Sequence, residues 1–443
     1  MELSKHPTQS IKKISELIEI NLKIPVYQRP YKWKAENVIQ LLDDIFDHII
    51  VQKKNYRIGS LILHREDENM NIVDGQQRLS TISILLHCLC NKNILLLNEN
   101  YKHKISKDNI VYNFRVINNW LLKISNKEIF QNKLLEKCEF VVFTVFKQEE
   151  AFQLFDSQNA RGKALEPYDL LKAFHLREMD GETEYEKANT VVRWEKSIDE
   201  KTLKPILNNH LFKIRKWVKN EKHYNFTNSH IDEFKGISLN KKLQFPFEAT
   251  LRILDGFVEN SKNDKYLKNI QIAQSYPFSI TMPIINGKRF FEYIDHYVTF
   301  KNKIFEKNDN SNFSIFYQTY CIGEVDYEEN GIFKRYQKSS RPGDQKVRNL
   351  FENVLILYQD KFGLEEFENF YQSFYKAVYS IRCNNKSISL KTILNSNEIK
   401  ILNEINDSIA PEKIKKYQFK LYNIDEKKEL ANDIEFIKKF ING

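Results

Sequence analysis

Glycine and proline are scarce in this chain, and their scarcity restricts the folds it can adopt more than any other feature. The 443 residues include 12 glycines and 10 prolines, which is about 5% of the chain against roughly 12% in an average protein. Because few residues break regular structure, the sequence favours long helices over a β-sandwich, a propeller or a collagen-like chain. At roughly 100–200 residues per domain, the length predicts two or three domains.

Composition excludes several further classes of protein. Hydrophobic residues make up 42% of the chain, too many for a disordered protein, and the net charge of +9 permits a polyanionic partner without locating one. The cysteines form no C-x-x-C pair, which argues against a disulfide scaffold and fits a reducing cytosol; they are Cys88, Cys90, Cys138, Cys321 and Cys383. No apolar run approaches the roughly 18 residues of a membrane span, so we expect a cytoplasmic protein without a membrane partner.

Two regions of the chain differ in their sequence pattern. In the first region, β-branched and apolar runs predict strands over 57–64, 71–73 and 139–146, and helical spacing predicts helices over 35–50, 77–90 and 168–178. In the second, helical spacing recurs over 185–200, 202–220, 242–260, 288–307, 345–361, 364–380 and 427–441. The sequence therefore predicts an α+β chain, with a small mixed α/β domain over 1–180 and a helical domain over 181–443.

The string DGQQR, from Asp74 to Arg78, follows a predicted strand and opens a predicted helix. Gly75 permits a sharp turn, and a helix start offers free N–H groups that suit a phosphate. Arg78 adds a bidentate phosphate donor, and Asp74 is suited to hold a divalent cation or to orient water. The same residues also suit an ordinary strand–turn–helix corner, with Asp74 as N-cap and Arg78 in a surface ion pair. No GxGxxG, GxxxxGK[ST] or HExxH motif is present.

Two further segments combine cations with residues that suit a nucleotide. The loop Asn159-Ala160-Arg161-Gly162-Lys163 places two cations around one glycine, which suits phosphate but also an ordinary solvated turn. The segment 27–33 (YQRPYKW) interleaves three aromatic residues with Gln28, Arg29 and Lys32. The aromatic residues Tyr27, Tyr31 and Trp33 could stack on a base, or they could pack in the core beside a strand edge.

The order of these motifs resembles a known family. The segments are IPVYQRPYKW at 24–33, GSLI at 59–62, IVDGQQRLST at 72–81, NARGKAL at 159–165 and DLLKA at 169–173. Over roughly residues 10–180, this succession resembles the domain of unknown function 262. That domain is the ParB/sulfiredoxin-like N-terminal domain of GmrSD-type modification-dependent restriction proteins and of phosphorothioation-sensing SspE proteins.

The resemblance implies a nucleotide site and a place in bacterial defence against phage DNA. The DGQQR segment would bind and hydrolyse a nucleoside triphosphate with Mg²⁺ or another divalent cation, which gives Asp74, Gln76, Gln77 and Arg78 catalytic roles and makes Asp74 the metal ligand. The nucleotide-binding residues would be Tyr27, Gln28, Arg29, Gly75, Asn159, Arg161 and Lys163. Tyr31 and Trp33 would stack on a base or on DNA.

The second region departs from many relatives, which carry a C-terminal HNH nuclease. An HNH site needs histidines, yet the last of the ten in this chain is His296. We therefore expect an NTP-hydrolysing component of a restriction or anti-phage system that senses or acts on DNA, with cleavage supplied by a separate nuclease subunit or a family paralogue. Two alternatives stay open: a nucleotide-gated DNA-binding module without turnover, and a nuclease with an unrecognised site near His223 and His230. The sequence also leaves open a homo-oligomer.

Overall fold

The chain divides into two compact units, which are described here separately. The computed structural model describes residues 7–25, 28, 30–90, 95–99, 101, 104–146, 150, 166–179, 181–242, 245–265, 276–306, 311–323, 327–329, 332–334, 339–415 and 432–442. The first unit, which we call the sheet unit, comprises Met1–Glu166 and Gly181–Glu195. The second, which we call the helical unit, comprises Pro167–Asp180 and Lys196–Gly443.

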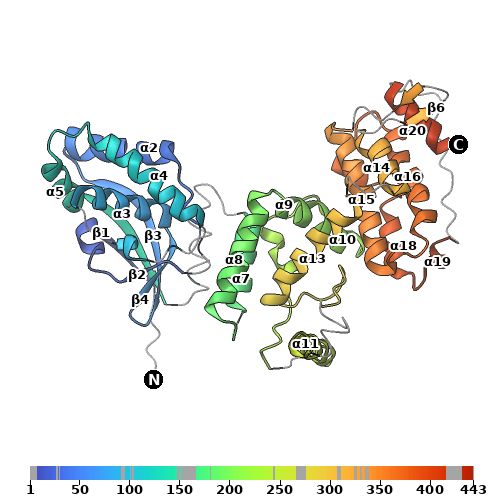
Figure 1. Cartoon of the computed structure of the whole chain (residues 1–443), viewed down its shortest axis with the longest axis horizontal. Helices are drawn as coiled ribbons and strands as arrows, with labels where there is room; N and C mark the ends of the chain where they lie inside the picture. The colour runs from blue at the N-terminus through green and yellow to red at the C-terminus, as the bar shows by residue number, and fades with distance from the viewer. Residues whose placement is uncertain are drawn as a thin grey trace. The chain divides into compact units, whose positions relative to one another are not determined.

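The sheet unit contains a mixed five-stranded sheet (Figure 1). Its strands are β1 (Thr8–Lys13), β2 (Leu22–Lys23), β3 (Tyr56–Glu66), β4 (Asn69–Asp74) and β5 (Cys138–Val145). The spatial order is β1-β5-β3-β4-β2, in which β5 runs parallel to β3 and antiparallel to β1, while β4 runs antiparallel to β3 and parallel to β2. β4 therefore runs toward the end of the sheet where β3 and β5 start, and its last residue, Asp74, pairs with Ile62 in the middle of β3.

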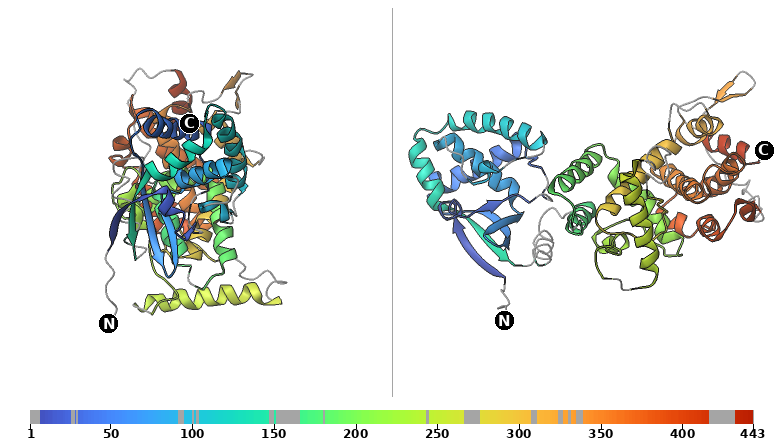
Figure 2. Two further views of the ribbon diagram at one scale, coloured as in Figure 1. Left: turned by 90° about the vertical axis from the view of Figure 1, so that its left-hand side faces the viewer. Right: turned by 60° about the horizontal axis from the view of Figure 1, so that its bottom comes forward.

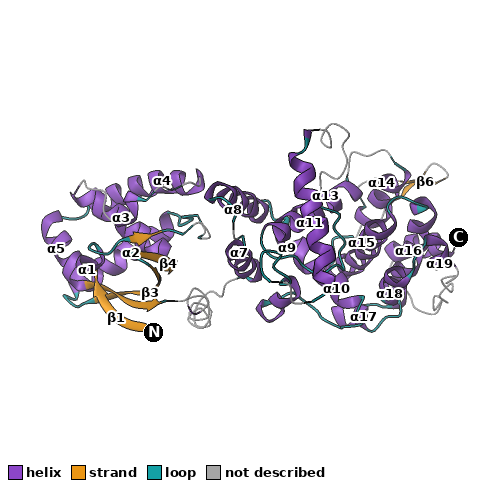
Figure 3. Cartoon of the chain, turned by 90° about the horizontal axis from the view of Figure 1, so that it is seen from below, coloured by secondary structure: helices purple, strands orange, loops and turns teal. Residues whose placement is uncertain are grey.

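Helices of the sheet unit gather on one side of that sheet (Figure 2, right; Figure 3). They are α1 (Ile14–Leu17), α2 (Ala35–Phe46), α3 (Gln76–Cys90), α4 (Lys104–Leu121) and α5 (Lys127–Lys137), with a π-helical turn at Asp47–Val51 and a short 3₁₀ turn at Leu95–Asn98. Helix α3 is largely buried, because Leu79, Ile82 and Leu85 lie in one core with residues of β3 and β5. The core therefore fixes the helix that carries most of the DGQQR string.

The helical unit is built almost entirely from helices in its described part. They are α7 (Pro167–Arg177), α9 (Leu203–Pro205), α10 (Phe212–Trp217), α11 (Phe247–Asn263), α13 (Lys288–Ile304), α14 (Asn312–Tyr317), α15 (Pro342–Phe362), α16 (Phe367–Asn384), α17 (Leu390–Leu394), α18 (Lys400–Asp407), α19 (Pro411–Lys415) and α20 (Asn432–Asn442). π-Helical turns occupy Ile206–Leu211 and Gln318–Ile322, and a 3₁₀ segment occupies Asn228–Phe234. Helix α8 (Glu184–Asp199) begins in the sheet unit, and its last residues belong to the helical unit.

Aromatic residues dominate the contact between α15 and α16. Phe351 of α15 meets Tyr375 of α16 edge-on, with ring centroids 5.6 Å apart, and Tyr358 of α15 meets Phe374 of α16 edge-on at the same distance. One buried ion pair joins the same helices, with Arg382 Nε 2.8 Å from Asp344 Oδ1. Edge-to-face and offset rings stabilise such a core beyond the area that they bury.

The α+β class predicted from the sequence is confirmed, and the differences have local causes. Sequence patterns indicated no element between 91 and 138, where α4 and α5 lie. Apolar residues of α4 such as Val111 and Phe114 are exposed, and the helix buries only a narrow stripe that includes Ile117 and Trp120. Strand β1 was also missed, since most of its side chains are exposed and show no apolar alternation. A two-stranded hairpin, β6 (Tyr327–Glu329) with β7 (Ile332–Lys334), interrupts the region expected to be helical.

Candidate functional site

β4 and α3 meet at a sharp corner formed by Asp74 and Gly75. Asp74 is the last residue of β4, Gly75 has a φ of +94°, and α3 begins at Gln76. A Cβ atom at position 75 would lie 2.9 Å from Leu61 Cδ1 and 3.1 Å from the carbonyl oxygen of Ser60. Because both the positive φ and this close approach disfavour a side chain, glycine is the residue that permits the corner. The strand–turn–helix predicted around DGQQR is therefore confirmed.

Arg78 lies on the first turn of α3 and reaches back toward the end of β4. Its Nη2 atom lies 3.3 Å from Asp74 Oδ2, and the two side chains keep 24% and 23% of their surface exposed. The guanidinium passes over Gly59 of β3, where an added Cβ would lie 1.8 Å from Arg78 Nη1. The absence of a side chain at position 59 thus makes room for the Arg78 guanidinium beside Asp74. Both charged groups stay partly exposed, so a ligand can reach them.

Tyr56, at the start of β3, lies within electrostatic range of Arg78. Burial raises the pKa of its phenol, the negative charge of Asp44 raises that pKa further, and the positive charge of Arg78 lowers it. The His48 ring, on the π-helical turn after α2, has its centroid 4.6 Å from that of Tyr56. Sequence patterns assigned no role to Gly59 or Tyr56; a lone glycine inside a predicted strand was the signal available for the former.

Gln28 and Gln77 bind backbone groups and hold the corner in place. The Gln28 side-chain amide donates to the carbonyl oxygens of Ile72 and Val73, at 2.8 and 2.7 Å, where the pairing of β2 with β4 has ended. Gln77 accepts a hydrogen bond from the N–H of Lys32 at 2.8 Å and donates to the carbonyl oxygen of Pro30 at 3.1 Å. These contacts give both glutamines a structural role beside the nucleotide role predicted for them.

Gln76 differs from its neighbour because part of its side chain has no partner. The residue is 5% exposed, and its Oε1 atom is buried without a hydrogen-bond partner among the described residues. A buried acceptor that makes no hydrogen bond costs roughly 1–3 kcal/mol. A ligand that donates a hydrogen bond at the start of α3 would remove this cost.

Tyr31 lies in the core of the sheet unit. Its side chain is fully buried, its hydroxyl lies 2.8 Å from Thr81 Oγ1, and it accepts from Asn113 Nδ2 at 3.0 Å. Burial raises the pKa of this phenol to about 12. In this arrangement the ring offers no face to a ligand, so the stacking predicted for Tyr31 would require it to leave the core. Trp33, in contrast, is only partly buried against the same core, and its stacking role stays a prediction.

Five of the predicted nucleotide-binding residues lie outside the described residues; they are Tyr27, Arg29, Asn159, Arg161 and Lys163. Their roles stay predictions. The described part of the site therefore consists of Gln28, the corner at Asp74 and Gly75, and the first turn of α3.

A divalent cation at the corner would depend on Asp74. Across the described ranges, no group of three or more His, Cys, Asp or Glu side chains is placed to hold a metal ion. Mg²⁺ often needs no such group, since it is bound through one or two carboxylates together with substrate phosphates and water. The partly exposed carboxylate of Asp74 fits that mode of binding.

His223 and His230, the pair considered for a nuclease, do lie together in the helical unit. Their ring centroids are 4.9 Å apart, and His230 Nδ1 lies 2.9 Å from Thr227 Oγ1. The nearest carboxylate contact of His223 is Glu221 Oε2, at 3.8 Å. These contacts stabilise the 3₁₀ turn and the segment before it. They do not form a metal site, because no group of three or more His, Cys, Asp or Glu side chains in the described ranges could hold a metal ion.

Sequence patterns missed a buried polar cluster in the helical unit around His210. His210 Nδ1 lies 2.8 Å from Asn353 Oδ1, and its Nε2 lies 3.6 Å from Glu352 Oε2. Burial lowers the pKa of this histidine to about 4, and the negative charge of Glu352 only partly opposes that shift. His210 and Asn353 are far apart in the sequence, so no spacing rule could have joined them.

Comparison with known protein families assigns both regions of the chain. Residues 186–433 match a family of unknown function, DUF7834. The chain belongs to this family. In this DUF7834 member, residues 11–176 match the N-terminal domain of the GmrSD restriction endonuclease, so the resemblance carried by the sequence motifs is confirmed. A search of curated proteins finds no match. Among the described helices of this DUF7834 protein, none combines the length and apolarity needed to cross a bilayer.

Proposed function

We propose that this chain is an NTP-binding and NTP-hydrolysing component of a restriction system that senses or acts on DNA. The match of residues 11–176 to a restriction-endonuclease domain supports the restriction context. In this proposal the nucleotide site is the corner between β4 and α3, and cleavage of DNA belongs to a separate nuclease subunit or a family paralogue.

One observation carries the nucleotide site: Arg78 is held over Gly59, beside the start of α3. A helix start presents backbone N–H groups and a positive dipole end to an anion, and a guanidinium can bind two phosphate oxygens at once. The unpartnered Oε1 of Gln76 adds a buried acceptor at the same place. Together these groups favour a ligand that combines phosphate with hydroxyl or amino donors, as a nucleotide does.

Asp74 is the group best placed to support hydrolysis. Its carboxylate can orient an attacking water or hold Mg²⁺ together with phosphate oxygens. Mg²⁺, when bound, would supply neutralisation of the charge that develops on the transferred phosphoryl group. Arg78 would then exchange its contact with Asp74 for one with phosphate, since Asp74 would hold the cation and a guanidinium can bind two phosphate oxygens at once.

The test is phosphate release by the full chain with each of the four NTPs and Mg²⁺, with and without DNA. Asp74→Ala and Arg78→Ala should each lower the rate about 100-fold or more, as loss of a charge-stabilising group does. Arg65→Ala is the matched control, because Arg65 is an exposed arginine on β3 whose Nε contacts only the carbonyl oxygen of Asp67 among the described residues. Equal rates in all three variants would contradict the proposal.

A second candidate, a nucleotide-gated binding module without turnover, is favoured by the Asp74–Arg78 ion pair itself. The contact with the Arg78 guanidinium occupies Oδ2 of Asp74, an oxygen that would otherwise be available to orient an attacking water. Measured binding of labelled ATP that Arg78→Ala weakens, together with no phosphate release from the unaltered chain under any condition, would select this candidate.

A further inference from the structure

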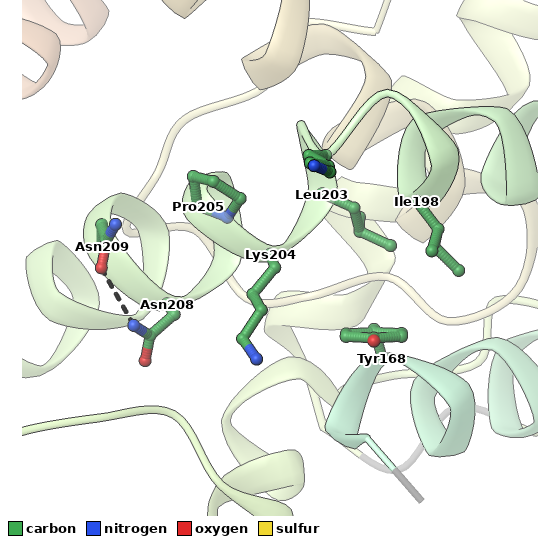
Figure 4. A pocket seen from close by; sticks show the side chains of 8 residues that line it. Tyr168, Ile198, Leu203, Lys204, Pro205, Asn208 and Asn209 are labelled. Carbon is green, nitrogen blue, oxygen red and sulfur yellow. Dashed lines mark hydrogen bonds between the residues drawn. The ribbon is translucent and has the colours of Figure 1, made fainter.

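The helical unit contains a pocket, whereas the DGQQR corner belongs to the sheet unit. Its volume is about 450 Å³, within the range of roughly 300–1,000 Å³ typical of ligand pockets. Its lining comes from α7, the end of α8, α9 and the π-helical turn that follows α9; the residues are Tyr168, Ile198, Lys201, Leu203, Lys204, Pro205, Asn208 and Asn209 (Figure 4). All of them belong to the helical unit.

The two asparagines are held in fixed orientations by their neighbours. Asn208 Oδ1 accepts from the N–H of Phe226 at 2.7 Å, and Asn208 Nδ2 donates to Asn209 Oδ1 at 2.9 Å. The backbone carbonyl of Asn209 accepts from Asn353 Nδ2 at 3.0 Å, and Asn353 in turn contacts the buried His210. The buried cluster thus holds the backbone of the π-helical turn in place. Asn209 Nδ2 donates to none of the described residues, so it is available to a ligand.

The charge of the pocket is positive. Lys201 and Lys204 line it, and none of its eight described lining residues is acidic. Figure 4 shows the Lys204 side chain extending between Tyr168 and Asn208. An amine between a ring and an amide favours a ligand that carries an anion next to a flat polar group.

The rest of the lining suits a flat heterocycle. Tyr168 supplies an aromatic ring, and Ile198, Leu203 and Pro205 supply apolar surface. Aromatic side chains stack on nucleobases regardless of sequence, and amide side chains hydrogen-bond to base edges. A simple inorganic anion would leave the ring and the amides unused, and an apolar ligand would make no use of the two lysine amines in the lining.

We propose that this pocket binds a single nucleotide unit, with the base on Tyr168 and Asn209 and the phosphate on Lys201 and Lys204. The unit can come from a free nucleotide or from one nucleotide of a single-stranded DNA segment, since both present the same base and phosphate. The pocket belongs to the helical unit and the corner at Asp74 to the sheet unit, and the two share no residue, so this inference does not depend on the NTPase proposal.

The experiment is photolabelling of the full chain with azidoadenosine monophosphate, followed by mapping of the labelled peptides. We expect label in the peptides that contain Tyr168 or residues 198–209, both in the unaltered chain and in an Arg78→Ala chain. Label found only near residues 59–78, or no saturable label at all, would overturn the proposal. Competition by a short single-stranded DNA oligonucleotide at lower concentration than free AMP would identify the DNA strand as the source, and the reverse order would identify the free nucleotide.

Variants test the roles of individual side chains. Tyr168→Ala should weaken binding about tenfold, the usual effect of removing a stacking ring, while Tyr168→Phe should retain it. Lys201→Glu changes an exposed side chain, is expected to leave the fold intact, and should weaken labelling by a similar factor. Lys391→Glu is the control, because this exposed lysine on α17 does not line the pocket. Equal labelling of the Lys201→Glu and Lys391→Glu chains would overturn the phosphate assignment and with it the proposal.

Discussion

The two units use charged side chains in opposite ways. In the sheet unit, the Asp74–Arg78 pair keeps about a quarter of each side chain exposed, and nearby glutamines hold the surrounding backbone. In the helical unit, Arg215 and Arg289 are only 6% and 4% exposed. Their guanidinium groups bind carboxylates and carbonyl oxygens of the same unit. A cation that remains partly exposed is available to a ligand, whereas a cation buried in a full set of partners stabilises packing.

Among the changes predicted below, lowering the pH should have the largest effect, and it should destabilise the helical unit. His175 and His210 are buried in the helical unit, and burial lowers their pKa values from 6.5 to about 3 and about 4. Between pH 6.5 and 4 the unfolded chain therefore binds more protons than the folded chain, so the free energy of unfolding falls as the pH falls. At roughly 1.4 kcal/mol per pH unit for each histidine, the loss at pH 4.5 is about 5 kcal/mol.

Urea unfolding at pH 7 and pH 4.5 measures this loss. His210→Gln should remove about half of the histidine contribution, because His175 keeps its contacts with Phe234 and Gly287. An identical pH dependence in the variant and the unaltered chain would mean that His210 is not buried and neutral.

Arg215→Met should destabilise the helical unit by about 3 kcal/mol. Arg215 Nη1 donates to the carbonyl oxygens of Ile280 and Met282, and its Nε donates to Glu233. Removing it leaves two carbonyl groups without their charged donor and removes one cation from a buried carboxylate.

Chemical unfolding measures the change, with Arg57→Met as the matched control. Arg57 pairs with Glu139 at the surface of the sheet unit, so its loss should cost less than about 1 kcal/mol. Equal losses of stability in the two variants would contradict the conclusion that buried arginines stabilise the helical unit more than surface arginines stabilise the sheet unit.

Gly59→Ala should abolish most of the phosphate release proposed for the sheet unit, while the helical unit stays unchanged. The new methyl group would displace the Arg78 guanidinium, so phosphate release should fall about 100-fold under the proposed function. Gly256→Ala is the control, since a Cβ on this glycine of α11 meets no atom within 4 Å. A Gly59→Ala chain with full activity would show that the position of Arg78 over this glycine is not needed for turnover.

Gln28→Leu should have the smallest effect, about 1–2 kcal/mol. The leucine cannot donate to the carbonyl oxygens of Ile72 and Val73, which lie at the end of β4. Hydrogen exchange of the β4 amides, compared between this variant and Gln52→Leu, would report the loosening locally. Within the described ranges, the Gln52 side-chain amide donates only to the exposed Asp47 carboxylate, so its loss should leave β4 protected. Unchanged exchange in β4 of the Gln28→Leu chain would exclude the structural role of Gln28.

Local chemistry explains which features the sequence could predict. Gly75 and the switch from strand to helical spacing predicted the corner, because both signals lie within a few residues of one another. Tyr31 was ambiguous for the opposite reason: its alternation with cations fits an exposed stacking residue, but Thr81 and Asn113, which are distant in sequence, accommodate its hydroxyl in the core. The cluster of His210 with Asn353 and the room made by Gly59 likewise depend on tertiary contacts, which no single stretch of sequence encodes.

Gly59 also affects how related genes should be interpreted. A chain can keep every letter of DGQQR and still lose the position of its arginine if a bulkier residue occupies the neighbouring strand. A search that counts the string alone would score such a chain as active. The strand position and the motif should therefore be read as one signature when genomes are surveyed for working copies of this domain.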